Sequence, residues 1–205
     1  MNQKERMLAQ LPYKAWLDGL SEERMAARKL THRYNQLDPE DEQEKGRLIR
    51  EILGGHGEYV NIEPPFRCDY GKHIQVGENF FANFNLVILD VARVTIGNNV
   101  MFGPNVSIYT AGHPVHPDSR NSGYEYGREI VIGDNVWIGG NVVVNPGVTI
   151  GSGTVIGSGS VVTKDIPDMV IAAGNPCRVI RKITEEDRKY FYRDQLFDVT
   201  DYLPE

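Results

Sequence analysis

The sequence has little cysteine and no excess of basic residues, and each absence excludes a class of protein. Only two of its 205 residues are cysteine, Cys68 and Cys177, and they lie far apart in a chain long enough to build its own core. A disulfide framework is therefore not expected, and reduced thiols fit a cytoplasmic protein. The 22 basic and 28 acidic side chains give a formal net charge of −6. This balance leaves no basic footprint for nucleic acid or for an anionic membrane.

The chain also lacks membrane-spanning and targeting features. No apolar run approaches the roughly 18 residues needed to span a bilayer. The first residues, MNQKERMLAQLPYKAW, are charged and contain no apolar signal-peptide core. Its length suits one domain with appendages. Glycine is somewhat abundant at 21 residues, and many of these glycines fall in a repeat.

The repeat is clearest over residues 132–167, which read in sixes as IGDNVW, IGGNVV, VNPGVT, IGSGTV, IGSGSV and VTKDIP. Each hexad opens with Ile or Val, and a glycine follows in four of the six. A fixed period of six residues is typical of a parallel β-helix. We expect one branched aliphatic side chain per hexad to point inward and stack on its equivalent in the next coil. The glycine is expected to let the backbone turn a corner, including with positive φ.

The same repeat begins earlier and is interrupted once. It first appears at Val76, and it resumes at Ile96, which lies 36 residues, a whole number of hexads, before Ile132. Residues 114–131 would place a proline, an arginine and a tyrosine at inward positions, where they cannot fill a narrow aliphatic core. We therefore predict that this stretch is a loop extruded just after His113. Long loops on a rigid scaffold often carry function.

The segments outside the repeat read as helical. Ser21 and Asp38 each resemble an N-cap with acidic residues behind it, and Thr184 is predicted to open a helix that continues to about Asp194. The predicted organisation has three units: a helical cap over residues 1–57, a β-helix over 58–183 and a C-terminal helix with a tail over 184–205.

His113 lies where the last regular coil gives way to the predicted loop. Imidazole is well suited to moving protons near neutral pH, so His113 is a candidate general base; a structural histidine is the alternative. His113 and His116 could instead be two metal ligands. Zinc normally needs at least three protein ligands, and no third His or Cys stands at a suitable spacing. We therefore expect no metal, which disfavours a metalloenzyme of the carbonic anhydrase type.

Several segments together resemble the hexapeptide-repeat sugar O-acetyltransferases of the maltose and galactoside type. They are the hexads, TAGHPVHP, VIGSGSVVTKDIP, AAGNPCRVIRKI and, nearer the N-terminus, EERMAARKLTHRYN and FRCDYG. The resemblance covers nearly the whole chain. It implies a mainly β fold, a left-handed parallel β-helix, as an exception to the usual right-handed crossover. It also implies a homotrimer with active sites between subunits, and acetyl-CoA as the donor.

The resemblance assigns roles to individual residues. It implies that His113 is the general base and that Asn83 and Asp90 line the acceptor pocket. Asp69 stands where galactoside enzymes have Ser, which allows an acceptor other than a galactoside. The family's acid near the N-terminus has no clean counterpart in this chain, and this departure leaves the sugar specificity open. Glu125, in the loop, is either an orienting partner of the imidazole in the acceptor site or a solvated acid. The donor contacts implied are Gly140, Ser158, Thr163, Lys164, Arg178 and Arg181.

The predicted function is acetyl transfer from acetyl-CoA to a hydroxyl of a sugar such as maltose, glucose or a galactoside. His113 would take the hydroxyl proton, and the backbone N–H of Gly140 would hold the oxyanion. Two alternatives stay open: an acetyltransferase acting on an antibiotic or an amine, and a non-catalytic solenoid scaffold. The expected partners are the sugar, acetyl-CoA and further copies of the chain, with no nucleic acid and no membrane.

Overall fold

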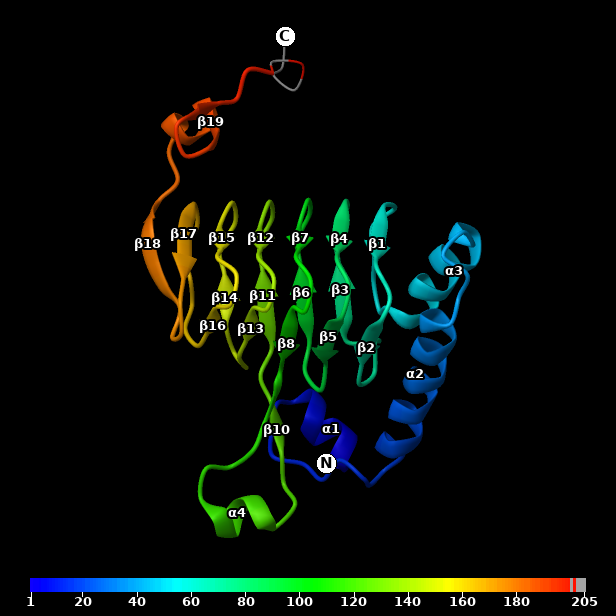
Figure 1. Ribbon diagram of the computed structural model, residues 1–205. Helices are drawn as coiled ribbons and strands as arrows, with labels where there is room; N and C mark the ends of the chain where they lie inside the picture. The colour runs from blue at the N-terminus through cyan, green and yellow to red at the C-terminus, as the bar shows by residue number, and fades with distance from the viewer. Residues whose placement is uncertain (200, 202–205) are drawn as a thin grey trace.

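The body of the protein is a solenoid in which the chain winds through three sheets in the same order in every coil (Figure 1). The computed structural model describes residues 1–199 and 201. We call the sheets I, II and III in the order in which each coil visits them. Their strands pair in parallel throughout, except at the last strand of sheet I. The prediction of a mainly β parallel β-helix is therefore confirmed.

The strands are short and stack coil upon coil. Sheet I contains β1 (Val60–Ile62), β4 (Phe80–Ala82), β7 (Met101–Phe102), β12 (Trp137–Ile138), β15 (Val155–Ile156), β17 (Val170–Ala173) and the antiparallel edge strand β18 (Arg178–Lys182). Sheet II contains β2 (Phe66–Cys68), β5 (Leu86–Leu89), β8 (Ser107–Tyr109), β13 (Val143–Val144) and β16 (Val161–Val162). Sheet III contains β3 (Ile74–Val76), β6 (Val94–Ile96), β11 (Ile130–Ile132) and β14 (Thr149–Ile150).

The register shows that the six-residue phase survives the interruption. Ile96 pairs with Ile132 across β6 and β11, which are 36 residues apart in the chain. The first residue of each hexad is buried, as predicted, and so is the fifth, where Val136, Val142 and Val148 are at most 2 % exposed. Two side chains per hexad, rather than the one expected, therefore fill the interior of the prism.

The glycines act differently from the prediction. Gly133, which follows the inward aliphatic of its hexad, does not have positive φ; a Cβ on it would lie 2.8 Å from the backbone nitrogen of Ser152 in the next coil. Close approach of successive coils therefore requires this glycine. The positive φ falls two residues later, at Asn135 and Asn141 in the first two hexads and at Gly147 in the third. Asn and Gly are the residues that adopt this conformation at least cost.

Three helices precede the solenoid: α1 (Gln3–Leu8), α2 (Leu20–Asn35) and α3 (Glu42–Ile52). The N-caps predicted for α2 and α3 are both wrong. The N-cap of α2 is Gly19, whose left-handed backbone (φ 82°) makes the turn without a side-chain cap. The N-cap of α3 is Asp41, whose carboxylate accepts from the Glu44 N–H at 3.0 Å. This bond leaves the predicted cap, Asp38, in the preceding turn.

The helices cover the open end of the solenoid. The Asn35 side chain accepts from the Phe66 N–H at 2.8 Å and donates to the Phe66 carbonyl at 2.9 Å, as a neighbouring strand would. The Tyr34 hydroxyl donates to the Ile62 carbonyl. The first coil therefore presents no free strand edge at these positions, which protects a solenoid from edge-to-edge association.

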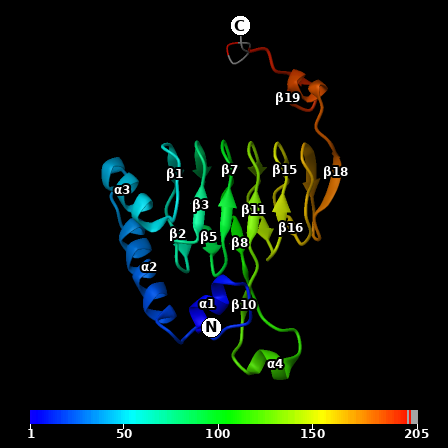
Figure 2. The same cartoon turned by 180° about the vertical axis from the view of Figure 1, so that it is seen from behind.

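The chain leaves the solenoid after β8 and returns at β11. Two antiparallel segments, β9 (Ala111–Gly112) and β10 (Tyr126–Gly127), form a stalk, and α4 (Pro117–Asn121) lies beyond it. Figures 1 and 2 both show α1 beside this stalk, on the same side of the solenoid as α4.

The predicted C-terminal helix is wrong. Residues 185–189 form one 3-10 turn, which ends in an antiparallel pair, β19 (Tyr190–Tyr192) with β20 (Gln195–Leu196). The run Tyr190-Phe191-Tyr192 favours strand over helix, and this segment projects beyond the solenoid in Figure 1. The end of the predicted tail, residues 200 and 202–205, lies outside the described residues. Within the described part of the chain, no helix is long and apolar enough to cross a membrane.

Candidate functional site

His113 lies on the edge of the prism between sheets II and III, where the stalk leaves the solenoid. Its side chain is exposed, and it has no hydrogen-bond or ion-pair partner within residues 1–199 and 201. His116 instead caps α4, since its ring nitrogen Nδ1 accepts from the Asp118 N–H at 3.3 Å. No group of three potential metal ligands occurs in the described part of the chain. The imidazole of His113 is therefore free to meet a substrate.

The N-terminal segment holds the stalk in place. Tyr13 and Glu125 exchange two backbone hydrogen bonds, at 2.9 and 3.0 Å, and the buried Tyr13 hydroxyl also donates to the Glu125 carboxylate. Burial, followed by this hydrogen bond, raises the pKa of Tyr13. Trp16 packs so closely on Gly123 that a Cβ there would lie 2.3 Å from its ring. Within one chain, Glu125 thus binds Tyr13 and makes no contact with the His113 imidazole.

A group of polar side chains lies around Glu125, near the base of the stalk. The Arg24 guanidinium donates to the Tyr70 hydroxyl at 2.8 Å and interacts electrostatically with Asp69 and Glu125. Burial raises the pKa of Asp69, and Arg24 opposes that shift. We call Arg24, Asp69, Tyr70 and Glu125 the polar cluster. Its acids and guanidinium can accept from and donate to sugar hydroxyls.

Asp90 holds in place the backbone that carries two residues of the polar cluster. It is fully buried, and its Oδ1 accepts from the backbone N–H groups of Asp69 and Tyr70, both at 2.9 Å. Burial raises the pKa of Asp90 to about 7. Its side chain therefore positions the turn that carries Asp69, and direct contact with an acceptor remains only a prediction.

A second set of predicted residues lies on another edge, between sheets I and II. Asn83, Gly140 and Ser158 lie in the turns that lead from β4, β12 and β15 into sheet II. The Gly140 carbonyl accepts from the Gly159 N–H at 2.9 Å, which joins two of these turns. A Cβ on Gly139 would lie 2.7 Å from the Ser158 nitrogen. Gly139 thus allows these two turns to stack closely, and the small residues Gly140 and Ser158 leave few side-chain atoms on this edge.

The remaining donor residues are divided between the edges. Thr163 and Lys164 follow β16, on the same edge as His113, and both are exposed. Arg178 begins β18 and pairs in register with Ala173, which continues the edge between sheets I and II. Arg181 is already bound: its guanidinium donates twice to Asp187, at 2.6 and 2.8 Å.

Sequence reasoning missed Arg24 and Tyr13. Arg24 contacts Tyr70, 46 residues away, and Tyr13 contacts Glu125, 112 residues away. Arg24 lies within the segment EERMAARKLTHRYN, but no pattern in the sequence links either residue to its partner, so these contacts follow only from the packing of the N-terminal segment on the solenoid.

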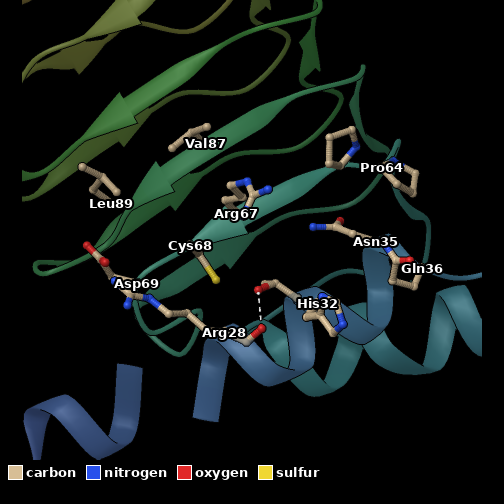
Figure 3. A pocket seen from close by; sticks show the side chains of 12 residues that line it. Arg28, His32, Asn35, Gln36, Pro64, Arg67, Cys68, Asp69, Val87 and Leu89 are labelled. Carbon is tan, nitrogen blue, oxygen red and sulfur yellow. Dashed lines mark hydrogen bonds between the residues drawn. The ribbon is translucent and has the colours of Figure 1, made fainter. Parts of the chain in front are cut away.

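A cavity of about 770 Å³ adjoins the polar cluster (Figure 3). It lies between α2 and the outer face of sheet II, and Asp69 and Leu89 line it near the edge of His113. Its other lining residues include Arg28 and His32 from α2 and Arg67 from β2.

Comparisons with known proteins give a consistent result. The profile described as "Maltose acetyltransferase hexapeptide capping motif" matches residues 6–57, and "Bacterial transferase hexapeptide (six repeats)" matches residues 129–164. The galactoside O-acetyltransferase of Escherichia coli is 47 % identical over 95 % of this chain and 96 % of its own. A solved galactoside acetyltransferase in complex with coenzyme A is 46 % identical, with a TM-score of 0.95 over 97 % of this chain and all of that one. A maltose O-acetyltransferase structure from Clostridium difficile is 51 % identical, with a TM-score of 0.89 over 90 % of this chain and 99 % of that one.

Proposed function

The chain belongs to the hexapeptide-repeat sugar O-acetyltransferases of the maltose and galactoside type, and on this premise we propose that it transfers the acetyl group of acetyl-CoA to a sugar hydroxyl in a site shared by two copies of the chain. One copy supplies His113 and the polar cluster. The other copy supplies Asn83 and the edge that carries Gly140 and Ser158.

His113 acts as the general base in this reaction. Its imidazole takes the proton of the acceptor hydroxyl while the hydroxyl oxygen attacks the thioester carbonyl. The Gly140 backbone N–H donates to the oxyanion of the tetrahedral intermediate, where a preorganised donor is most effective. When the C–S bond breaks, the CoA sulfur leaves with the electron pair and receives the proton from His113. Asp69 and Arg24 hold neighbouring hydroxyls of the sugar.

The proposal of a shared site depends on one observation: within one chain, His113 and Asn83 lie on different edges of the prism. His113 lies on the edge between sheets II and III, and Asn83 lies on the edge between sheets I and II. All of sheet II stands between these edges. A convex prism cannot bring two of its own edges together, so the second edge must come from another copy. In such a contact, the His113 edge of one copy meets the Asn83 edge of the next. This arrangement forms a closed ring when the rotation that relates neighbouring copies divides evenly into a full turn. Three copies would form the proposed homotrimer.

The outer face of sheet I supports such a contact. Its outward-facing side chains include Phe81, Met101 and Trp137, one from each of three successive strands. Met101 is 51 % exposed and Trp137 53 % exposed. A row of exposed apolar side chains is typical of a protein–protein contact, and this row adjoins the edge of Asn83.

Mixed oligomers test the shared site. His113→Ala and Asn83→Ala are each expected to lose most turnover alone. When differently tagged copies of the two variants are refolded together in equal amounts, about a quarter of the sites should contain both natural residues. We expect release of free CoA at about a quarter of the wild-type rate, measured with a panel of mono- and disaccharides. Mixed oligomers with no recovered activity, or a wild-type protein that is monomeric by light scattering, would refute the shared site.

A further inference from the structure

The cavity between α2 and sheet II carries an inference about the acceptor. We propose that it is an extended acceptor subsite that selects saccharides with an anionic group, a carboxylate or a phosphate ester, on the unit next to the one that is acetylated. This inference rests on the proposed function and specifies its substrate class.

The cavity has the size and the walls of a ligand site. Its volume of about 770 Å³ lies within the range of about 300–1,000 Å³ that small-molecule pockets occupy. Figure 3 shows the Arg28 side chain extending from α2 towards Asp69, with His32 farther along α2, Arg67 on β2, and Val87 and Leu89 along β5. The two apolar side chains can contact the non-polar face of a sugar ring while the cationic groups meet its substituents.

The two guanidinium groups in the cavity form no ion pair or hydrogen bond with the described residues of the chain. Within residues 1–199 and 201, the guanidinium groups of Arg28 and Arg67 have no hydrogen-bond or ion-pair partner. By contrast, Arg47 and Arg181 each bind a carboxylate elsewhere on the surface. A guanidinium offers five donors in a fork that matches the oxygens of a carboxylate or a phosphate. Two unpaired guanidinium groups facing one cavity therefore favour an anionic ligand.

The lining also contains one acid, Asp69, which lies beside Arg28 in Figure 3. Asp69 interacts electrostatically with Arg28, but no ion pair joins them within the described residues. It belongs to the polar cluster, where a carboxylate accepts from sugar hydroxyls. The cavity therefore combines an acceptor of hydroxyl groups with donors to an anion, Arg28 beside Asp69 and Arg67 farther along the sheet.

The cavity reaches the edge of the prism on which His113 lies. Leu89, in its lining, pairs in register with Tyr109, which precedes His113 by four residues. A sugar ring held at Asp69 with a hydroxyl towards His113 would extend its next unit along sheet II. The Gln36 side chain, also in the lining and without a partner in the described part of the chain, can bind hydroxyls of that unit.

Matched acceptors test the inference. Maltose, maltobionate and maltose 1-phosphate share one intact non-reducing ring. Maltose 1-phosphate adds charge to the second ring, whereas maltobionate has an open-chain, charged gluconate as its second unit, so maltose 1-phosphate is the closer match to maltose. We expect a KM about tenfold lower for the anionic acceptors than for maltose, with an advantage that shrinks as salt is added. Arg28→Gln and Arg67→Gln should each raise the KM of the anionic acceptors towards that of maltose. Lys29→Gln removes a neighbouring charge of α2 outside the cavity and should retain the preference.

The outcomes separate this inference from the proposed function. If no acceptor releases free CoA, the proposed function fails, and calorimetric binding of maltobionate and maltose to the wild-type protein still decides the subsite. Equal KM values or affinities for neutral and anionic acceptors overturn the inference. A preference that persists in the double variant of Arg28 and Arg67 also overturns it. So does a change of oligomeric state in these variants, since the cavity would then be a contact between copies.

Discussion

Replacing Asp90 by Asn tests whether burial or hydrogen bonding controls the carboxyl group beneath the polar cluster. Burial disfavours the carboxylate, whereas the two backbone N–H groups that donate to its Oδ1 favour it. Burial dominates, and the pKa of Asp90 is raised from 3.8 to about 7. Asn offers the same accepting oxygen without a charge, so the variant removes the ionisation and keeps the two bonds.

The sign of the effect follows from linkage. A carboxyl whose pKa is higher in the folded state than in the unfolded state binds its proton more tightly when folded. Its cost to folding is absent below pH 3.8, grows as the pH rises towards 7 and is constant above that. The difference between 3.8 and about 7, at about 1.4 kcal/mol per unit, amounts to about 4 kcal/mol.

Denaturant unfolding of both proteins between pH 4 and pH 8, at one protein concentration, measures this term. The free energy of unfolding of Asp90→Asn minus that of the natural protein should rise with pH, by up to about 4 kcal/mol. Taking the difference cancels the titration of groups that are common to both proteins and do not interact with residue 90. A difference that does not change with pH would show that the backbone bonds balance burial, and a difference that falls would show that they outweigh it.

Asp187→Asn is the control for this measurement. Hydrogen bonding from Arg181 lowers the pKa of Asp187 to about 2, so its contribution to stability is complete above pH 3.8 and is lost only as the pH falls towards 2. The same subtraction for Asp187→Asn should therefore be flat between pH 5 and pH 8.

Three further predictions concern turnover, donor binding and packing. His113→Ala should lower kcat by about a hundred- to ten-thousandfold with little change in the KM for acetyl-CoA, whereas His116→Ala should be much milder; a His113 variant with over a third of the natural kcat would contradict its role. Lys164→Ala should raise the KM for acetyl-CoA about tenfold at low salt, and Arg181→Ala should raise it less, because its guanidinium is already bound within the chain; equal donor KM values in the natural protein and both variants would assign these cations to the surface alone. Gly133→Ala should lower the midpoint of thermal unfolding, because its Cβ would lie 2.8 Å from the backbone of the next coil, and an unchanged midpoint would refute the need for close approach.

The sequence predicted the solenoid well because the six-residue period reflects the packing of one coil on the next. Each inward position repeats the same environment, so Ile96 and Ile132 pair even though an extruded loop separates them. The second-position glycines were predicted to allow positive φ, and this reason was wrong. The second position of the hexad needs a small residue, and it is the fourth position that has positive φ. A single hexad, IGDNVW, contains both requirements, with Gly133 and then Asn135. The pattern was therefore visible, but its two causes could not be separated without the packing of successive coils.

The ends of the chain were harder to predict because no period constrains them. The acidic turn after Thr184 resembles a helix start, and Asp187 does accept from the Thr184 N–H at 2.9 Å. The three aromatic residues that follow then stop the helix after one turn. Likewise, Tyr13 could not be linked to Glu125 from the sequence, because the two residues are 112 positions apart in the chain.

The geometry of the prism explains why the candidate site is dispersed in the sequence. A three-sided solenoid offers flat faces and convex edges, and neither encloses a substrate. A concave site therefore needs elements outside the prism. In this chain α2 packs against sheet II and leaves a cavity, and the stalk leaves the solenoid at the edge that carries His113. Neither addition brings His113 to the edge that carries Asn83, because sheet II separates them. A neighbouring copy supplies that edge in the proposed assembly, so the contacts that join the copies would also complete the site.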